Sequence, residues 1–198
     1  MSAEVTVRPA AAADRSAIEA VVAAAFGEDK DGRVVRMVRA LEVTGATRAG
    51  LVALEKGELV GHVQLSRSWI DARQALVEVL VLSPLSVAPA RQRRGIGTAL
   101  VAAALAEAER LGAPAVFLEG APTYYGPRGF DAAIGHGFAR PSARIPAPAF
   151  QVALLPAHQE WMVGGLVYPD AFWTTDTVGL RDPLLRRVED ELNGSAAG

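Results

Sequence analysis

Cysteine is absent from the 198 residues, and its absence excludes disulfides, thiolate metal ligands and a cysteine nucleophile together. Lysine is nearly absent, since Lys30 and Lys56 are the only two, and arginine supplies almost all of the basic charge. The formal net charge of −2 argues against a broad basic surface for nucleic acid or for an anionic membrane. No apolar run approaches the roughly 20 residues that span a bilayer.

The residues that are present describe a folded domain. Apolar residues make up 51% of the chain and charged residues 21%, which is typical of a globular protein and not of a disordered one. Residues 1–4 carry neither a basic nor an apolar targeting segment. We therefore expect a cytoplasmic protein with no nucleic-acid partner and no membrane partner.

Apolar spacing predicts strands and helices that alternate along the chain. One helix is expected after Asp14, which would be its N-cap, and a second helix after Gly32. The clearest helix is expected at 98–111, where an apolar stripe runs from Leu100 to Leu111. Strands are expected at 5–9, 51–54, 59–65, 76–87, 115–118, 150–155 and 164–168, with a helical turn at 122–128 and a charged helix at 180–192. This order predicts a mixed α/β sheet, with residues 1–140 as the core and 141–198 completing the same domain.

The most informative segment runs from strand to turn to helix at 82–98. Gly95 and Gly97 stand where the chain turns into the helix, and the free N–H groups of a helix N-terminus can bind phosphate. Arg91, Arg93 and Arg94 add charge nearby. A tight strand–helix connection would use the same glycines. Leu100 stands where a dinucleotide fingerprint needs its third glycine, and no Gly-Lys-Ser/Thr ending follows, so these phosphate-binding motifs are disfavoured.

Several motifs together resemble the GNAT superfamily of N-acetyltransferases. Residues 92–97 (Gln-Arg-Arg-Gly-Ile-Gly) are similar to its Gln/Arg-x-x-Gly-x-Gly/Ala signature, and residues 124–130 (Tyr-Tyr-Gly-Pro-Arg-Gly-Phe) resemble its short helix with a tyrosine before Gly-Phe. The doubled tyrosine, Leu-Ser-Pro-Leu at 82–85 and Val-Tyr-Pro-Asp-Ala-Phe at 167–172 are similar to the YhbS-like subgroup of predicted N-acetyltransferases. The resemblance covers roughly residues 5–172.

The resemblance implies an acyl-CoA N-acyltransferase fold, with helices on both faces of a mixed sheet that splays at the cofactor cleft. It implies transfer of an acetyl group from acetyl-CoA directly to a primary amine, of a small molecule or a protein, through a ternary complex. A non-catalytic acyl-CoA-binding or regulatory module is the alternative. The implied cofactor-binding residues lie on the strand before the loop and in the loop itself: Leu85, Ser86, Val87, Gln92, Arg93, Arg94, Gly95, Ile96, Gly97, Thr98 and Ala99.

By the same resemblance Tyr125 is the general acid, since coenzyme A leaves as a thiolate that a phenol can protonate. The alternative is that both Tyr124 and Tyr125 are packing residues. Two positions depart from the subgroup. Pro127-Arg128 replaces the usual Arg-Phe, and Ala121 replaces an aspartate, so a differently shaped turn is expected.

The base that takes the amine proton stays open between Glu78, Glu119 and water.

His62, His136 and His158 are scattered, and no His and carboxylate pair has metal-ligand spacing, so no metal is expected. The apolar stretches 161–163 and 172–173 are assigned to the core, with a homodimer face as the alternative. The acceptor cannot be named from the sequence.

Overall fold

The computed structural model describes residues 5–27 and 31–179, and the expected helix at 180–192 lies outside them. One mixed sheet has the strand order β1-β2-β3-β4-β5-β7-β6, and β8 pairs with β3. Strands β4 and β5 are parallel, whereas β5 and β7 are antiparallel. The strands are β1 (Val5–Pro9), β2 (Thr47–Glu55), β3 (Glu58–Ala72), β4 (Leu76–Val87), β5 (Ala115–Glu119), β6 (Asp131–Ala132), β7 (Phe150–Leu154) and β8 (Gly164–Val167).

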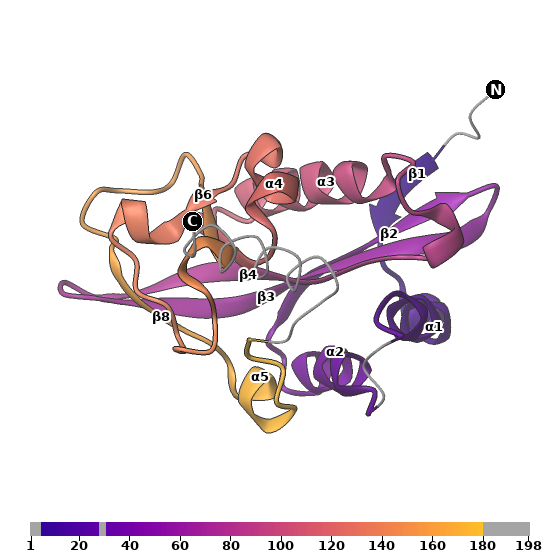
Figure 1. The fold of residues 1–198 in the computed structure, drawn as a ribbon, viewed down its shortest axis with the longest axis horizontal. Coiled ribbons are helices and arrows are strands. Elements are labelled where there is room, and N and C mark those ends of the chain that lie inside the picture. The colour runs from indigo at the N-terminus through magenta and orange to yellow at the C-terminus, as the bar shows by residue number, and fades with distance from the viewer. Residues whose placement is uncertain (1–4, 28–30, 180–198) are drawn as a thin grey trace, which may run out of the picture.

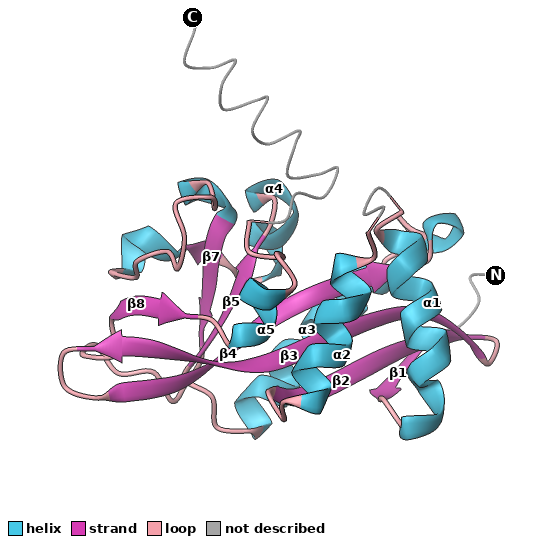
Figure 2. Ribbon diagram, turned by 90° about the horizontal axis from the view of Figure 1, so that it is seen from below, coloured by secondary structure: helices cyan, strands magenta, loops and turns pink. Residues whose placement is uncertain are grey.

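Helices cover both faces of this sheet (Figures 1 and 2). In Figure 1, α3 and α4 lie above the sheet and α1, α2 and α5 lie below it. Successive side chains of β4 point to opposite faces of the sheet. Val79 and Val81 pack in the core on the side of α1 and α2, whereas Leu80 and Leu82 pack in the core on the side of α3. The helices are α1 (Arg15–Ala25), α2 (Arg33–Val43), α3 (Ile96–Arg110), α4 (Pro122–Tyr125) and α5 (Asp170–Thr174). The expected mixed α/β architecture is confirmed.

The hairpin between β2 and β3 turns at Lys56 and Gly57, where φ is 53° and 82°. Two successive left-handed residues form the two-residue loop that suits the twist of a hairpin. The expected strand at 59–65 is too short, since β3 continues to Ala72. Ser66 and Ser68 interrupt the apolar pattern, yet both are fully buried in the sheet.

Asp14 is the N-cap residue of α1, as expected, and α1 begins at Arg15. Asp14 lies in a 3₁₀ turn (Ala12–Asp14) before α1, where its carboxylate accepts from the Ala11 N–H at 2.8 Å and from Arg8 at 2.6 and 2.9 Å. It therefore stabilises the turn and does not cap α1 by its side chain. Helix α3 ends at Arg110, and Leu111, assigned to the apolar stripe, is exposed beyond it.

Strands β4 and β5 diverge after a short contact. Their paired residues are Leu80 with Val116 and Val81 with Phe117. Beyond them, β4 carries a register shift against β3 around Ser83 and Pro84, because proline has no N–H to donate. This divergence is the splay that the resemblance implies, and it positions the site.

Candidate functional site

A cleft lies where β4 separates from β5. Residues 81–85 of β4 form one side, Glu119 stands at the end of β5, and Tyr125 comes from α4. The remaining walls come from Phe26 just after α1, from α2 and from the segment 168–177. The fold thus brings together Leu85, Tyr125 and Glu119, which lie in separate segments of the sequence.

The strand implied to hold the donor, residues 85–87, has one paired edge. Leu85 lies opposite Val63 and Val87 opposite Gly61 on β3. On the other side, the pairing with β5 ended at Val81. A strand edge presents N–H and C=O groups to which an extended ligand can add as a further strand.

The loop that follows, residues 92–95, leads directly into α3. The Gln92 Nε2 donates to the Val87 carbonyl at 3.2 Å, which ties the loop to the end of β4. Arg93 and Gly95 have φ of 60° and 84°, and α3 begins at Ile96. The N–H groups of the first turn have no acceptor within the helix, so this end of α3 offers donors and partial positive charge.

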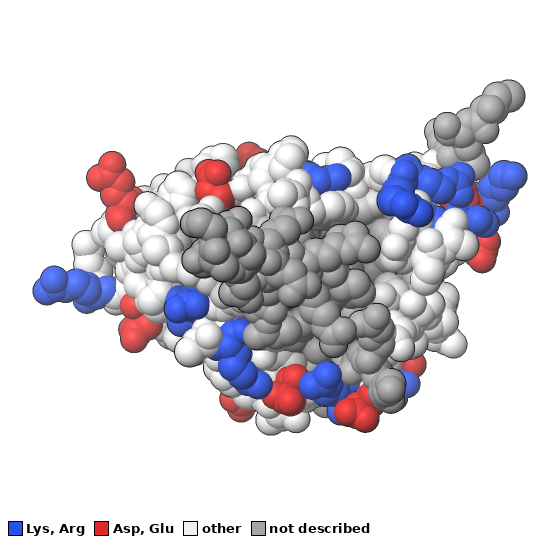
Figure 3. All heavy atoms as spheres, viewed as in Figure 1, with Lys and Arg blue, Asp and Glu red and all other residues white. Residues whose placement is uncertain are grey.

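The side chains of Arg91 and Arg94 bind a buried carboxylate at the end of β2. Arg91 Nε lies 2.8 Å from Glu55 Oε2, and an Arg94 terminal nitrogen lies 2.8 Å from Glu55 Oε1. Figure 3 shows basic side chains gathered at the end of the sheet that carries the β2–β3 hairpin. Sequence reasoning missed Glu55, because a glutamate beside a hairpin turn carries no signal of its distant partners. Arg93 remains exposed.

Tyr124 packs toward the first turn of α3. A Cβ at Gly97 would lie 2.3 Å from its hydroxyl oxygen, so glycine is what allows this approach. The Arg128 guanidinium stacks 3.8 Å from the Tyr124 ring centroid and donates to the Thr98 hydroxyl at 2.7 and 3.1 Å. It also donates to the Tyr124 carbonyl. Arg128, one of the two departures from the subgroup, therefore ties the tyrosine turn to the first turn of α3.

Tyr125 faces the cleft instead. Its ring lies against Gly120, where a Cβ would come within 2.2 Å of a ring carbon. It makes edge contacts with Tyr124 at 4.9 Å and with Phe130 at 5.8 Å between ring centroids. The two tyrosines are thus held in different environments, although they are neighbours in the chain.

The two candidate bases lie in different places. Glu119 lines the cleft, where its carboxylate accepts from the Tyr168 hydroxyl at 2.9 Å and from the Gly179 N–H at 3.0 Å. Burial raises the pKa of Glu119 to about 7. Glu78 pairs with Arg48 at 2.9 and 3.2 Å in a separate hollow beside the C-terminal end of α3. The structure places Glu119 in the cleft and Glu78 outside it.

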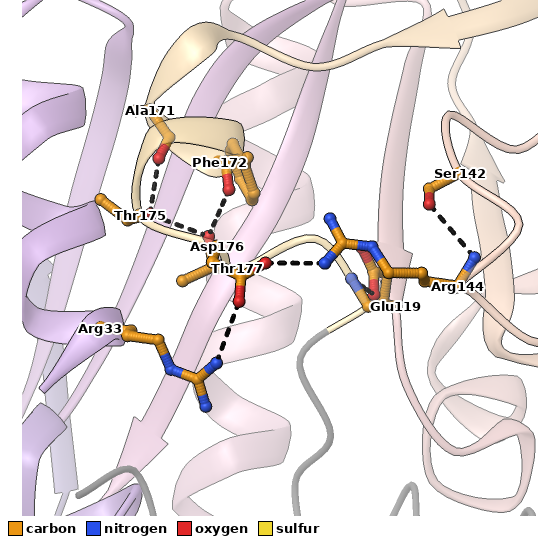
Figure 4. A network of polar contacts seen from close by, with 10 residues as sticks. Arg33, Glu119, Ser142, Arg144, Ala171, Phe172, Thr175, Asp176 and Thr177 are labelled. Atoms are coloured by element: carbon orange, nitrogen blue, oxygen red, sulfur yellow. Dashed lines mark hydrogen bonds and ion pairs between the residues drawn. The ribbon is translucent and has the colours of Figure 1, made fainter. Parts of the chain in front are cut away.

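The segment around Glu119 is secured by ion pairs (Figure 4). Asp176 lies 2.7 Å from the Arg144 guanidinium and 3.4 Å from that of Arg33, and the hydrogen bond from Arg144 holds the pKa of Asp176 below its ordinary value. The backbone N–H of Arg144 donates to Ser142 at 3.1 Å. Sequence reasoning missed this network, because Arg33 and Asp176 are 143 residues apart.

The histidines do not gather. His62 is buried, and burial lowers its pKa to about 4.

Within residues 5–27 and 31–179 no group of three His, Cys, Asp or Glu side chains lies close enough to hold a metal ion. In the same ranges no helix is long and apolar enough to cross a membrane. Of the apolar stretches 161–163 and 172–173, most of which was expected in the core, Phe172 is buried, residues 161–163 are partly buried against the core and Trp173 is exposed.

Comparison with known proteins gives consistent results. The model of the acetyltransferase (GNAT) family matches residues 28–130. An uncharacterised N-acetyltransferase of Escherichia coli (strain K12), YjhQ, is 32% identical over 123 residues, which are 62% of this chain and 67% of YjhQ.

Solved structures agree with the family match. The GNAT family N-acetyltransferase YhbS of Escherichia coli, crystallised with CoA, has a TM-score of 0.76 at 23% identity and covers 87% of this chain and 93% of its own. A GNAT family acetyltransferase of Brucella melitensis, crystallised with acetyl-CoA, has a TM-score of 0.70 at 29% identity, over 85% of this chain and 98% of its own.

Proposed function

The chain belongs to the acetyltransferase (GNAT) family, and from this membership we propose that it transfers the acetyl group of acetyl-CoA directly to a primary amine within a ternary complex. One observation carries the proposal. The same cleft is lined by the stretch of β4 that does not pair with β5, by Tyr125 and by Glu119. A thioester lying along β4 would therefore have an acid and a base within the same cavity.

The donor would bind by backbone groups along β4 and the cofactor loop. The peptide groups of residues 85–87 are proposed to pair with the pantetheine arm, and the N–H groups of residues 92–99 to hold the pyrophosphate. Support comes from the pairing of Arg91 and Arg94 with Glu55, which occupies their side chains and leaves the backbone donors of α3 for the phosphates.

Tyr125 is proposed as the general acid. The amine nitrogen attacks the thioester carbonyl carbon, and the tetrahedral intermediate collapses with cleavage of the carbon–sulfur bond. The departing thiolate takes the proton of the Tyr125 hydroxyl, which regains one from solvent. Because the sequence has no cysteine, an acyl-cysteine intermediate is excluded and direct attack is the simplest route.

Glu119 is proposed as the base that takes the proton of the attacking amine, directly or through one water. A carboxyl whose pKa lies near 7 is deprotonated often enough at neutral pH and still accepts a proton readily. Its position in the cleft favours it over Glu78, whose carboxylate binds Arg48 in another hollow.

Calorimetric titration with acetyl-CoA, followed by thiol release across a panel of primary amines, tests the proposal. We expect saturable binding, and thiol release that requires an amine and yields its N-acetyl derivative. Binding without amine-dependent release would favour the acyl-CoA-binding module. Release at the same rate without any amine would indicate a thioesterase and contradict the proposed transfer.

A further inference from the structure

The acceptor side of the cleft is walled by apolar side chains. Phe26, which follows α1, lines it together with Val34 and Met37 of α2 and Phe172 of α5. Val34, Met37 and Phe172 also belong to the core, so these walls are backed by packed side chains. A surface of this kind favours contact with an apolar body over a highly hydrated one.

Charge in the cleft is confined to one group. Among the cleft-lining residues that the structure describes, Glu119 is the one acidic or basic side chain. Its two oxygens each accept one hydrogen bond, from Tyr168 and from the Gly179 N–H, and each retains a further lone pair. One ammonium or amine group can therefore bind at Glu119.

The arginines near Glu119 are directed elsewhere. Figure 4 shows the guanidinium groups of Arg33 and Arg144 turned toward Asp176, to which both bind. Asp176 therefore holds the two guanidinium groups that would otherwise be available to an anionic acceptor. Within the described part of the cleft lining, a carboxylate or phosphate would lose its hydration without gaining a cationic partner, and the ionised form of Glu119 would repel it.

Building on the proposed acetyl transfer, we propose that the acceptor is a primary monoamine on an aromatic or aliphatic body, with no carboxylate or phosphate beside the amine. A second ammonium would be disfavoured for the same reason as an anion. The described lining offers it no second carboxylate, and the apolar walls would desolvate it.

Matched amine pairs test this assignment. Phenethylamine and phenylalanine differ by one carboxylate, and hexylamine and 1,6-diaminohexane differ by one ammonium. We expect kcat/KM to be at least tenfold higher for the first member of each pair. Equal or reversed values would overturn the inference while leaving acetyl transfer intact, whereas failure to bind acetyl-CoA would contradict the proposed function itself. If none of the four is acetylated, titration into the CoA complex measures the same preference, and equal affinities would overturn it.

Asp176→Asn tests the part played by the arginines. Asn tolerates the left-handed φ of 53° at this position and differs from Asp mainly by the lost charge, so the backbone should be retained. Releasing Arg33 and Arg144 should lower the preference for phenethylamine over phenylalanine at least threefold. Glu107→Gln, which removes the partner of the exposed Arg110 on α3, should leave the preference unchanged. An unchanged preference in Asp176→Asn would overturn the role assigned to Asp176.

Discussion

At the scale of single residues, the two adjacent tyrosines are held by different contacts. The Tyr124 hydroxyl lies against Gly97, and the Arg128 guanidinium stacks on the Tyr124 ring. Tyr125, in contrast, lines the cleft. Successive residues of a helix point about 100° apart, so neighbours can serve different surfaces. Position relative to the cleft therefore distinguishes the two side chains, although their chemistry is the same.

Replacing Tyr125 by Phe should lower kcat roughly 10- to 1000-fold, because the departing thiolate loses its proton donor. The affinity for acetyl-CoA, measured by calorimetry, should change little, since the ring and its contacts remain. Tyr124→Phe is the matched control and should retain most of the turnover. A kcat for Tyr125→Phe that equals that of the unaltered protein would remove Tyr125 from the mechanism.

Glu119→Gln should lower kcat/KM roughly 10²- to 10⁴-fold, the range expected when a general base is lost. In the unaltered enzyme kcat/KM should rise with pH through about 7, where Glu119 loses its proton, and this limb should vanish in the variant. Glu78→Gln serves as the control and should keep both rate and pH profile. If Glu78→Gln alone abolishes the limb, the base is Glu78.

At the scale of elements, the short turn that carries Tyr125 is joined to α3. The Thr98 hydroxyl and the Tyr124 carbonyl both accept from Arg128, and Thr98 lies in the first turn of α3. Arg128 therefore links the helix that is proposed to hold phosphate to the turn that carries the proposed general acid. Pro127-Arg128, the departure noted in the sequence, makes this connection possible.

Gly97→Ala tests the contact between these elements. Its Cβ would lie 2.3 Å from the Tyr124 hydroxyl oxygen, and overpacking should cost about 1–3 kcal/mol of unfolding free energy. Adding Tyr124→Phe should restore most of this loss, because the next Tyr124 atom lies 3.6 Å from that Cβ. Denaturant unfolding of the two single variants and the double variant measures the effect. Additive losses would show that the hydroxyl does not cause the strain.

At the scale of the whole molecule, two buried groups oppose each other as pH changes. His62 has a pKa near 4, against 6.5 ordinarily, so below about pH 6.5 the unfolded chain binds a proton that the folded chain refuses. Stability from this group falls as pH falls. Glu119 has a pKa near 7, against 4.5, so between these values the folded chain holds the extra proton. Stability from Glu119 therefore falls as pH rises.

Between about pH 4.5 and 6.5 these two slopes should cancel, and Glu119→Gln should expose the effect of His62. We expect the unfolding free energy of the variant, relative to the unaltered protein, to fall by about 1 kcal/mol per pH unit as pH is lowered across this window. Denaturant unfolding at three pH values measures it. Glu107→Gln is the control, since Arg110 lowers the pKa of Glu107 and its titration lies below the window. Parallel curves for Glu119→Gln and the unaltered protein would contradict the opposing shifts.

The sequence by itself determined most of the elements and the family. Apolar periodicity predicted α1 to α3 and the positions of most of the strands. These features arise from interactions within a few residues, so they can be predicted from the sequence without knowledge of the fold. The errors fall where tertiary burial overrides local pattern, as at Ser66 and Ser68, which lengthen β3.

Only the tertiary structure decided how the site is assembled. It separated Glu119 from Glu78, turned Arg91 and Arg94 toward Glu55, and placed Asp176 between Arg33 and Arg144. These partners are separated by tens of residues or more, so no local spacing encodes them. They meet because β4 and β5 diverge, and because the segment after β8 returns to cover the gap that this divergence leaves.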